Sequence, residues 1–459
     1  MVRLTSADIA SLVQESIELG TPTARPRETV IRSLPEPARF NLVHIITGMR
    51  RCGKTFYLFQ LIHDLMGSGI PANRIFYFDF SDARLKPTDA QTLESVVDEY
   101  WRLVPEARDE GCYLFLDEVQ ECPDWQGFCQ RIAGHERVTL TITGSSSRVS
   151  SDEIATNFRG RAHVHEMWPL SFREFCAFRD IAVPAPGQRA FSPQARSRYE
   201  SAFDDYLLVG GFPAVQQAVP ADRIELLQGY VRDVVARDVA ERMGREDITL
   251  ATQLALFGIR NTGCELSVNG LVEQLEEAGD QKVYWTKVNR LLELFGKAYL
   301  LHYLPEYTTA LKPGASKPKK VYAEDQGLAY AVSRANQQDV GKRLETAIYL
   351  ELRRRNAGRR TDTVTSLTVP KTRQQVDFLL GDALASEPYE LIQVTVGMEH
   401  DKTRARELGS LEAGMRHAGL SHGAVITLRE QGKTSTESGD IDIVPAWQWA
   451  LQTPGASTE

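Results

Sequence analysis

The sequence predicts an α/β protein whose first part contains a parallel β-sheet with helices on both faces. Short apolar segments are expected to be strands, and the segments between them repeat apolar residues at helical spacing. Strands that are apolar throughout, in alternation with helices, indicate a parallel sheet buried on both sides. The predicted strands are residues 41–47, 75–80, 112–116 and 138–143, and the predicted helices between them are 56–66 and 93–103.

Length and composition limit the class of protein. A chain of 459 residues is too long for one compact core, so several domains are expected. The net charge of −8 argues against a non-specific nucleic-acid coat. No apolar run approaches the ~20 residues that span a bilayer, and the N-terminus lacks the apolar core of a signal peptide. We therefore expect a cytoplasmic protein with no membrane partner. Because the cytosol is reducing, the cysteines are expected to be free thiols.

Composition and pattern divide the chain into four predicted parts. Residues 1–40 form an N-terminal segment of one or two helices, and residues 41–185 form the α/β domain. Residues 186–330 are helical, and a helix–helix–strand order within 266–304 predicts a winged-helix-like module. Residues 331–459 form a second α/β domain. Its expected elements are helices at 344–355 and 403–417 and strands at 365–369, 376–380, 390–396 and 423–427.

Residues 48–55 fit the phosphate-loop pattern G-x-x-x-x-G-K-[ST] at every fixed position. The glycines let consecutive backbone N–H groups point at phosphate oxygens, and the following helix offers its positive end to the same anion. Lys54 is expected to reach the β- and γ-phosphates, and Thr55 to hold Mg²⁺. The predicted nucleotide contacts are Gly48, Met49, Arg50, Arg51, Cys52, Gly53, Lys54, Thr55 and Phe56.

Two adjacent acids, Asp117 and Glu118, follow the third predicted strand. Ligands of open α/β sheets bind at the carboxyl ends of the strands, so these acids should face the phosphate loop. Phosphoryl transfer needs a second metal ligand and a group that orients water. Asp117 is the expected Mg²⁺ partner, and Glu118 is expected to polarise the attacking water.

Polar residues after the fourth predicted strand are weaker candidates for the catalytic site. Ser145 lies in a serine-rich loop, where its hydroxyl could contact the γ-phosphate or simply belong to the loop. Arg159 or Arg161 could neutralise charge in the transition state, in cis or from a neighbouring subunit, or could be an ordinary surface pair. A basic cluster further along the chain could be a DNA site, although a solvated helix face is the commoner case: Arg353, Arg354, Arg355, Arg359 and Arg360.

Six segments in one order resemble a known family. The segments are GMRRCGKT, YLFLDEVQ, TITGSSS, FRGR, PLSFREF and VGGFPAV. The sequence resembles the prokaryotic AAA-type P-loop ATPases that carry a C-terminal domain of unknown function with a restriction-endonuclease-like core. The resemblance runs from about residue 35 to about residue 450. It implies that ATP is the nucleotide, and that an ATP-binding domain, a winged helix and a nuclease-like domain follow one another. It does not decide whether the protein forms an oligomeric ring or acts as a monomer.

The same resemblance implies a nuclease-like site in the last domain. Nucleases of this class hold Mg²⁺ between acids on a helix and a strand and add a lysine on the next strand. By resemblance, Glu345, Asp377 and Gln393 take the acid positions, and Thr395 takes the lysine position. Threonine cannot replace an ammonium, although Lys402 could migrate into the role. Metal-dependent cleavage, a degenerate fold kept for binding, and ordinary structural polar residues all stay open.

These observations predict an enzyme that binds ATP with Mg²⁺, hydrolyses it, and couples hydrolysis to a conformational switch of the C-terminal domain. Two alternatives remain: an ATP-regulated, metal-dependent DNA nuclease, and a nucleotide-gated binding protein with negligible turnover. Double-stranded DNA or a protein partner fits this prediction, and a homo-oligomer is compatible with it.

Overall fold

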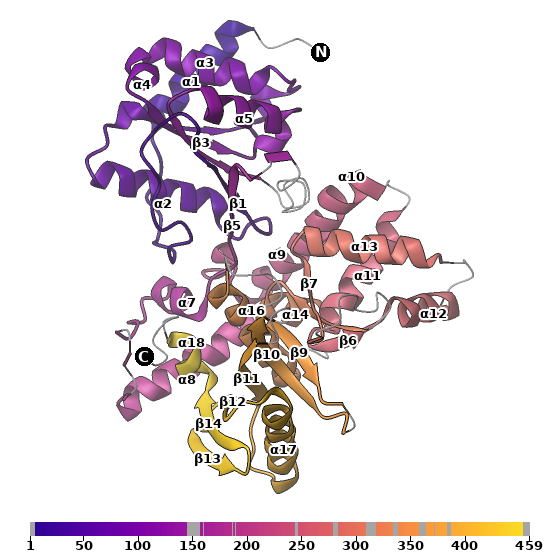
Figure 1. Ribbon diagram of the computed structural model, residues 1–459. Coiled ribbons are helices and arrows are strands. Elements are labelled where there is room, and N and C mark those ends of the chain that lie inside the picture. Colours follow the sequence, from indigo (N-terminus) through magenta and orange to yellow (C-terminus); the bar gives the residue numbers. More distant parts are fainter. Residues whose placement is uncertain are drawn as a thin grey trace. The chain divides into compact units, whose positions relative to one another are not determined.

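A computed structural model shows two compact units, Met1–Met167 and Trp168–Glu459 (Figure 1). The predicted boundary at residue 185 lies within the second unit, and the four-part division stays a prediction. No helix in the described part of the chain is long and apolar enough to cross a membrane. The structure describes residues 5–144, 157–158, 160–185, 187–188, 190–243, 247–278, 283–308, 318–333, 338–357, 364–370, 372–382 and 387–452.

The first unit contains a five-stranded sheet in the order β2-β3-β4-β1-β5, with every pair of neighbours parallel. The predicted parallel sheet is therefore confirmed. The edge strand β5 was not predicted, because its sequence AHVHE has no continuous apolar run. The strands are β1 (Val43–Thr47), β2 (Ile75–Asp79), β3 (Cys112–Asp117), β4 (Val138–Thr143) and β5 (Ala162–Glu166).

Helices cover both faces of this sheet. On one face, α2 (Lys54–Gly67) packs its aromatic and aliphatic side chains against β1 and β3. On the other face, α1 (Ser6–Leu19), α3 (Thr92–Leu103) and α5 (Trp125–His135) share one apolar core with the sheet. Burying one large apolar side chain contributes roughly 1.5–3 kcal/mol, so two such cores hold the strands rigidly. A short helix, α4 (Pro105–Asp109), precedes β3.

The N-terminal segment belongs to this first unit. Thr5 and Asp8 form a capping box that starts α1, and Gly20 ends it at a φ of 61°. Residues 20–40 contain no second helix, so the chain has one of the one or two expected. The Tyr57 hydroxyl of α2 accepts hydrogen bonds from the backbone of Val30 (2.9 Å) and Ile31 (2.8 Å). Residues 27–34 therefore pack against α2.

The second unit starts with helices and a small antiparallel sheet. The sheet order is β6-β8-β7, and two helices lie between β6 and β7 in the chain. The expected helix–helix–strand order is thus present. The helices are α7 (Phe172–Phe178), α8 (Pro193–Val209), α9 (Pro220–Asp233), a π-helical turn (Val234–Val239), α10 (Ala240–Met243), α11 (Ile248–Arg260), α12 (Val268–Ala278), α13 (Trp285–Lys297) and α14 (Gln326–Val332), and the strands are β6 (Cys264–Leu266), β7 (Leu301–Leu304) and β8 (Lys319–Ala323).

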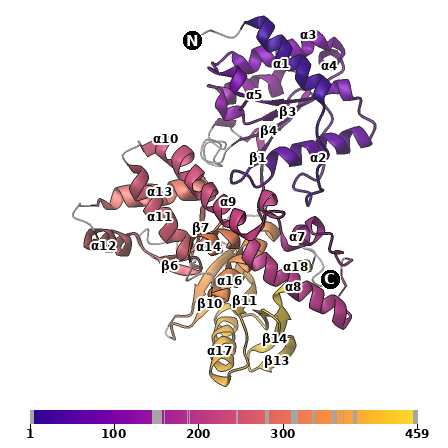
Figure 2. The ribbon, with the colours of Figure 1, turned by 180° about the vertical axis from the view of Figure 1, so that it is seen from behind.

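A mixed six-stranded sheet in the order β13-β14-β12-β11-β10-β9 follows (Figure 2). Helix α17 packs on β10, β11 and β12 over an apolar core. The expected helices and strands of this region are all present, but β13 and β14 were not predicted. The sequence of β13 is polar, and that of β14 has no long apolar run. The elements are α16 (Val340–Arg355), β9 (Val364–Thr368), β10 (Gln375–Asp382), β11 (Glu387–Thr395), α17 (Asp401–Ala418), β12 (His422–Thr427), β13 (Gly432–Thr436), β14 (Gly439–Pro445) and α18 (Ala446–Leu451).

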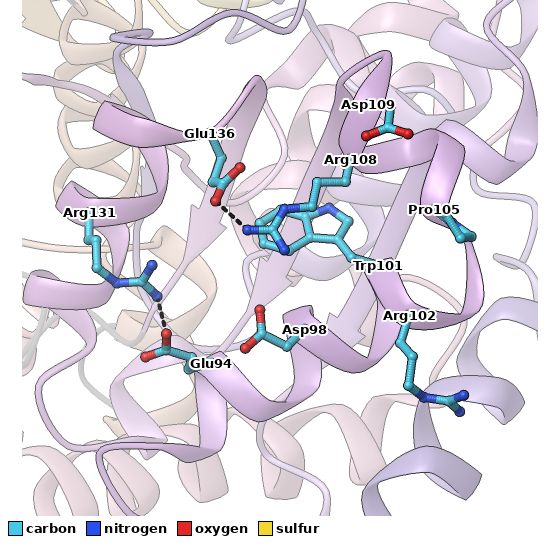
Figure 3. Close-up of a pocket in the computed structure, with 9 residues that line it drawn as sticks. All are labelled: Glu94, Asp98, Trp101, Arg102, Pro105, Arg108, Asp109, Arg131 and Glu136. Atoms are coloured by element: carbon cyan, nitrogen blue, oxygen red, sulfur yellow. Dashed lines mark hydrogen bonds and ion pairs between the residues drawn. The ribbon is translucent and has the colours of Figure 1, made fainter.

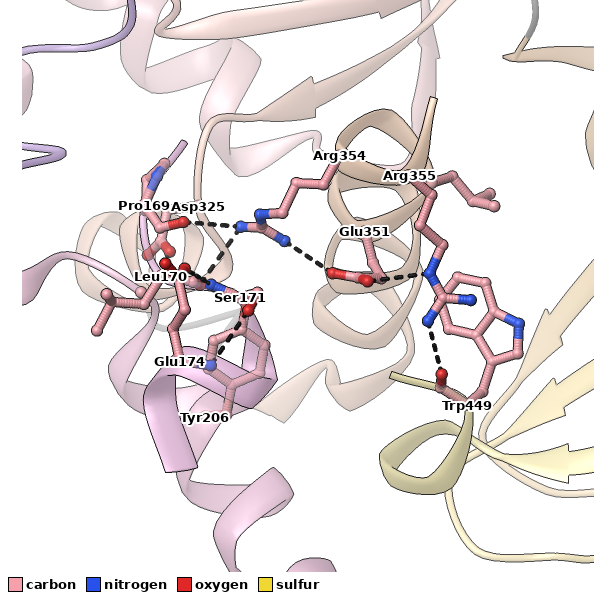
Figure 4. A network of polar contacts seen from close by, with 12 residues as sticks. Pro169, Leu170, Ser171, Glu174, Tyr206, Asp325, Glu351, Arg354, Arg355 and Trp449 are labelled. Carbon is pink, nitrogen blue, oxygen red and sulfur yellow. Dashed lines mark hydrogen bonds and ion pairs between the residues drawn. The ribbon is translucent and has the colours of Figure 1, made fainter. Parts of the chain in front are cut away.

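One polar network explains why PLSFREF and VGGFPAV occur together (Figure 4). The Leu170 amide donates to the Gly211 carbonyl (2.6 Å), and the Gly211 amide donates to Asp325 Oδ2 (2.6 Å). A Cβ on Gly211 would lie 2.4 Å from the Leu170 carbonyl oxygen, so only glycine permits this approach. Arg354 of α16 donates to the carbonyls of Pro169 (3.1 Å) and Leu170 (3.3 Å). The two motifs are thus joined by hydrogen bonds within the second unit.

Candidate functional site

The phosphate loop lies between β1 and α2, at the carboxyl end of β1. Gly48 and Gly53 have φ angles of 145° and 110°, which side chains other than glycine rarely adopt. A Cβ on Gly48 would also lie 2.1 Å from the carbonyl oxygen of Met167. The two fixed glycines of the motif are therefore required by backbone geometry as well as by the pattern.

Lys54 is buried at the start of α2, and its ammonium turns back over the loop. Its Nζ donates to the carbonyls of Gly48 (2.9 Å) and Met49 (3.1 Å). The carbonyl of Cys52 accepts a hydrogen bond from the buried guanidinium of Arg27 (2.8 Å). Arg27 was not predicted as a site residue, because it lies outside the motif and no pattern links it to the loop. Arg27 holds the far side of the loop in place.

Asp117 is buried at the end of β3, where three hydroxyl groups converge on its carboxylate. Thr143 of β4 donates to Oδ1, Tyr77 of β2 donates to Oδ2 (3.2 Å), and the Thr55 side chain also hydrogen-bonds the carboxylate. The structure therefore brings together Thr55 and Asp117, the two predicted metal ligands. Burial raises the pKa of Asp117 to about 6; the bond from Thr143 opposes this shift, and the charge of Glu118 adds to it.

Glu118 follows Asp117 in a left-handed conformation with a φ of 52°. Its backbone N–H donates to the Thr143 hydroxyl (3.2 Å), and its carboxylate accepts from the Gln120 side chain. A non-glycine residue in this conformation is strained, and such strain is concentrated at functional sites. Thr143 thus contacts both acids, although sequence analysis chose Ser145, two residues later, as the hydroxyl of interest.

The remaining predicted residues of the first unit are placed as follows. Phe56 is 53% exposed on α2, and Arg51 is exposed in the loop. Arg161 lies at the amino ends of the strands, whereas the loop follows the carboxyl end of β1. Its carbonyl accepts a hydrogen bond from the Val43 amide at the start of β1. Five residues of strand, about 16 Å, separate the two ends of β1, so Arg161 does not reach the loop of its own chain. Ser145 and Arg159 lie outside the described residues.

We expect Asp117→Asn to stabilise the first unit at pH 7 by roughly 2–3 kcal/mol. The pKa of Asp117 rises from 3.8 to about 6 on folding, so the folded state binds this proton more tightly than the unfolded state. The folded state is therefore favoured below pH 3.8, and this advantage is lost as the pH rises through 6. Asparagine carries no charge and avoids that loss.

The measurement is the melting temperature against pH for wild type, Asp117→Asn and the control Asp109→Asn, whose side chain is exposed. The gain should be present at pH 7 and absent near pH 4, and the control should match wild type. Equal melting temperatures for Asp117→Asn and wild type at pH 7 would contradict this account.

In the second unit, the structure brings together the three predicted nuclease-like residues. The Gln393 amide oxygen accepts from the Asp377 backbone N–H (3.3 Å). The second oxygen of Asp377 accepts from the Val394 amide (2.9 Å). Glu345 accepts from the Tyr322 hydroxyl (2.7 Å). These residues come from α16, β10, β11 and β8.

Lys320 of β8 bridges the two acids. Its ammonium lies 3.0 Å from Glu345 Oε1 and 2.8 Å from Asp377 Oδ1. Burial alone lowers the pKa of Lys320, but the charges of Asp377 and Glu345 exceed that effect and raise the pKa above its usual range. Strand β8, which carries Lys320, was not predicted from the sequence. Among the described residues, the lysine that bonds these acids is Lys320, and Lys402 is exposed on α17.

Two arginines of the basic cluster on α16 are largely buried and do not form a solvated face. Arg354 and Arg355 have side chains only 12% and 15% exposed. Arg354 holds the PLSFREF segment, as described above. Arg355 pairs with Glu351 (3.0 Å) and donates to the Trp449 carbonyl (2.6 Å) (Figure 4). Arg353 lies over the Trp168 ring. Arg359 and Arg360 lie outside the described residues.

A surface pocket of about 430 Å³ lies on the first unit, among residues of α3, α4 and α5 (Figure 3). Its cations are held by acids: Arg108 pairs with Glu136 (2.7 Å), and Arg131 pairs with Glu94 (2.8 Å). Arg108 also lies 4.7 Å above the Trp101 ring. These helices share the core opposite α2, so this pocket is distinct from the phosphate loop.

Residues 41–176 match the family model described as an AAA domain. Residues 200–339 match a model described as a domain of unknown function, DUF8612. The first match spans the phosphate loop, Asp117 and Glu118. It supports the expected AAA-type ATPase domain.

Full-length relatives carry no functional description. An uncharacterized protein of Methanocaldococcus jannaschii is 28% identical over 96% of this chain and 95% of its own length. An uncharacterized protein of Haemophilus influenzae is 24% identical over 83% of this chain and 92% of its own length. Among solved structures, a Walker-type ATPase of Pyrococcus abyssi aligns with a TM-score of 0.39 at 11% identity, covering 72% of this chain and 95% of that one. The Orc1 protein of Aeropyrum pernix in complex with DNA aligns with a TM-score of 0.28 at 15% identity, covering 74% and 93%.

Proposed function

We propose that the first unit binds ATP with Mg²⁺ and hydrolyses it. The observation that carries this proposal is the contact between Thr55, the last residue of the phosphate-loop motif, and the buried carboxylate of Asp117. A hydroxyl and a carboxylate at the mouth of a phosphate loop are oxygen ligands suited to Mg²⁺. The raised pKa of Asp117 supports the same role, because a nearby divalent cation would offset the cost of its buried charge.

The proposed roles follow from the contacts around these residues. Gly48 and Gly53 allow the backbone amides to turn toward phosphate, and Lys54 supplies a positive charge over the loop. Glu118 polarises water, with Gln120 and Thr143 fixing its direction. Mg²⁺, when bound, neutralises charge on the phosphates. The hydroxyl of Thr143 is a positioning group, because it joins the two acids.

Glu118→Gln should retain ATP binding and lower ATP hydrolysis by about 10²–10⁴-fold, because an amide cannot accept a proton from water. Single-turnover hydrolysis and equilibrium binding of a fluorescent ATP analogue measure the two properties separately. Glu121→Gln is the matched control, since Glu121 lies three residues away and pairs with Lys86. Unchanged hydrolysis in Glu118→Gln would assign the role of base to another residue, whereas negligible turnover in wild type would favour the nucleotide-gated binding protein.

We further propose that the nuclease-like site does not cleave nucleic acid. The ammonium of Lys320 lies between Glu345 and Asp377, where a metal-dependent nuclease needs its cation. The ammonium offsets one of the two carboxylate charges, and Gln393 replaces an acid. This arrangement supports a degenerate fold that is retained for binding or stability.

We propose a protein rather than DNA as the partner of the second unit. The order of α11, β6, α12, α13, β7 and β8 supports a winged-helix module. Its helix α12 nevertheless exposes three acids, which repel phosphate: Glu273, Glu276 and Glu277. Arg354 and Arg355 are engaged inside the unit and are not available to a nucleic acid.

A further inference from the structure

Three histidines lie together on the face of the first sheet that α2 covers. His44 is on β1, and His163 and His165 are on the neighbouring edge strand β5. His44 and His163 are direct partners in the parallel register, and His165 follows two residues later, on the same face. Each ring offers one nitrogen such that these nitrogens lie within 4.8 Å of one another. Neither the phosphate loop nor the two acids uses this cluster.

The distance between two of the rings matches metal coordination. His44 Nδ1 lies 3.2 Å from His165 Nε2. Two nitrogens that bind one tetrahedral zinc at 2.0–2.1 Å lie about 3.3 Å apart, so the separation of these two nitrogens fits a shared ion. His163 is exposed at the sheet edge, where its side chain can rotate toward the other two.

The hydrogen bonding of the buried rings also supports metal binding. His165 makes a hydrogen bond with the backbone of Val30, which fixes the ring as outer partners do in histidine metal sites. In contrast, His44 Nε2 is buried and has no hydrogen-bond partner in the described part of the chain. If His44 Nδ1 donates to His165, then a lone pair of His44 is buried without a donor, which is an unfavourable arrangement.

Burial also keeps both rings in the form that binds metal. Loss of solvent, with the charge of His163 as the smaller cause, lowers the pKa of His44 to about 4. Burial likewise lowers the pKa of His165 to about 3, with smaller effects from His163 and His44. Burial thus disfavours the charged form of both rings.

We propose that His44, His163 and His165 bind one divalent transition-metal ion, with Zn²⁺ as the expected metal. Imidazole nitrogens suit zinc, whereas Mg²⁺ requires oxygen ligands, so this site is separate in chemistry from the ATP site. Three histidines leave a fourth position for water. The ion would join the edge strand β5 to β1, the strand that leads into the phosphate loop. The proposal does not depend on ATP hydrolysis.

The test is Zn²⁺ binding to the untagged full-length protein, without nucleotide and with excess Mg²⁺ to occupy oxygen sites. Calorimetry should give one zinc per chain, and Co²⁺ should give the visible absorption of a tetrahedral site. His163→Ala should weaken Zn²⁺ binding by about 100-fold or more, since even loss of an outer partner costs about 10–100-fold. Zinc should raise the melting temperature of wild type but not of His163→Ala.

Two controls separate this site from adventitious binding. His135→Ala removes an exposed histidine of the same unit, and Cys264→Ser removes the cysteine that is not fully buried. Both variants should bind zinc as wild type does. Because His163 is exposed, His163→Ala should fold normally, and its melting temperature in chelator should equal that of wild type. Absence of stoichiometric zinc binding, unchanged binding in His163→Ala, or loss of binding in Cys264→Ser would overturn the proposal.

Discussion

Lys54→Ala is expected to lower ATP hydrolysis by at least about 10²–10³-fold, the usual cost of removing one charge-stabilising group from a transition state. The Lys54 ammonium is fixed over the loop by the carbonyls of Gly48 and Met49, so no other side chain of the loop can replace its position. Alanine leaves the helix intact. The loss should therefore appear in phosphate release, while the fold is retained.

The matched control is Lys86→Ala, which removes the exposed lysine that pairs with Glu121. Phosphate release should be measured for wild type and both variants, with and without double-stranded DNA. We expect normal release in the control and no effect of DNA. Full activity in Lys54→Ala would contradict the proposed ATP site. A rise with DNA would contradict only the proposal of a protein partner.

Lys320→Met is expected to destabilise the second unit by about 3–5 kcal/mol at pH 7, the cost of breaking a buried ion pair by removing one partner. The side chains of Lys320, Glu345 and Asp377 are only 13%, 17% and 13% exposed. Without the ammonium, two carboxylates face each other in a medium that solvates charge poorly. Methionine has a similar length but carries no charge, so the effect reports the charge rather than the volume.

The pH dependence of this variant has a definite sign. Burial and the charge of Asp377 already raise the pKa of Glu345, and Lys320 opposes that shift. In Lys320→Met the folded-state pKa of Glu345 should therefore rise further above the unfolded value of 4.5. Stability of the variant should fall as the pH rises through that folded-state pKa, and should recover as the pH falls toward 4.5.

Calorimetric melting of the second unit measures this effect. Lys342→Met is the control, because the Lys342 side chain is 30% exposed and its contact with Asp339 is long, at 4.0 Å. It should change stability by less than about 1 kcal/mol. Lys320→Met combined with Asp377→Asn should regain much of the loss. If Lys320→Met were as stable as wild type, Lys320 would not have the proposed structural role. Mg²⁺-dependent DNA cleavage by wild type, abolished in Asp377→Asn, would instead favour the ATP-regulated nuclease.

Residues far apart in the chain explain what sequence analysis missed. Arg27 contacts the phosphate loop, and Thr143 contacts the two acids. Both contacts exist only because folding brings together residues that are far apart in the chain. Strand β8, which carries Lys320, was not predicted, since the alternation in its sequence KKVYA is too short to stand out. The histidines of β1 and β5 are more than a hundred residues apart, and the polar sequence of β5 concealed the strand that pairs them.

The sequence by itself determined the parallel sheet, the phosphate loop and the acids that follow β3, because each depends on local order along the chain. Apolar strands, a glycine pattern and a strand end are properties of consecutive residues. Only the tertiary structure decided which charges compensate one another. It brought Lys320 between Glu345 and Asp377, turned Arg354 and Arg355 inward, and set Arg161 at the far edge of the sheet. Electrostatic pairing depends on distance in space, which sequence separation does not encode.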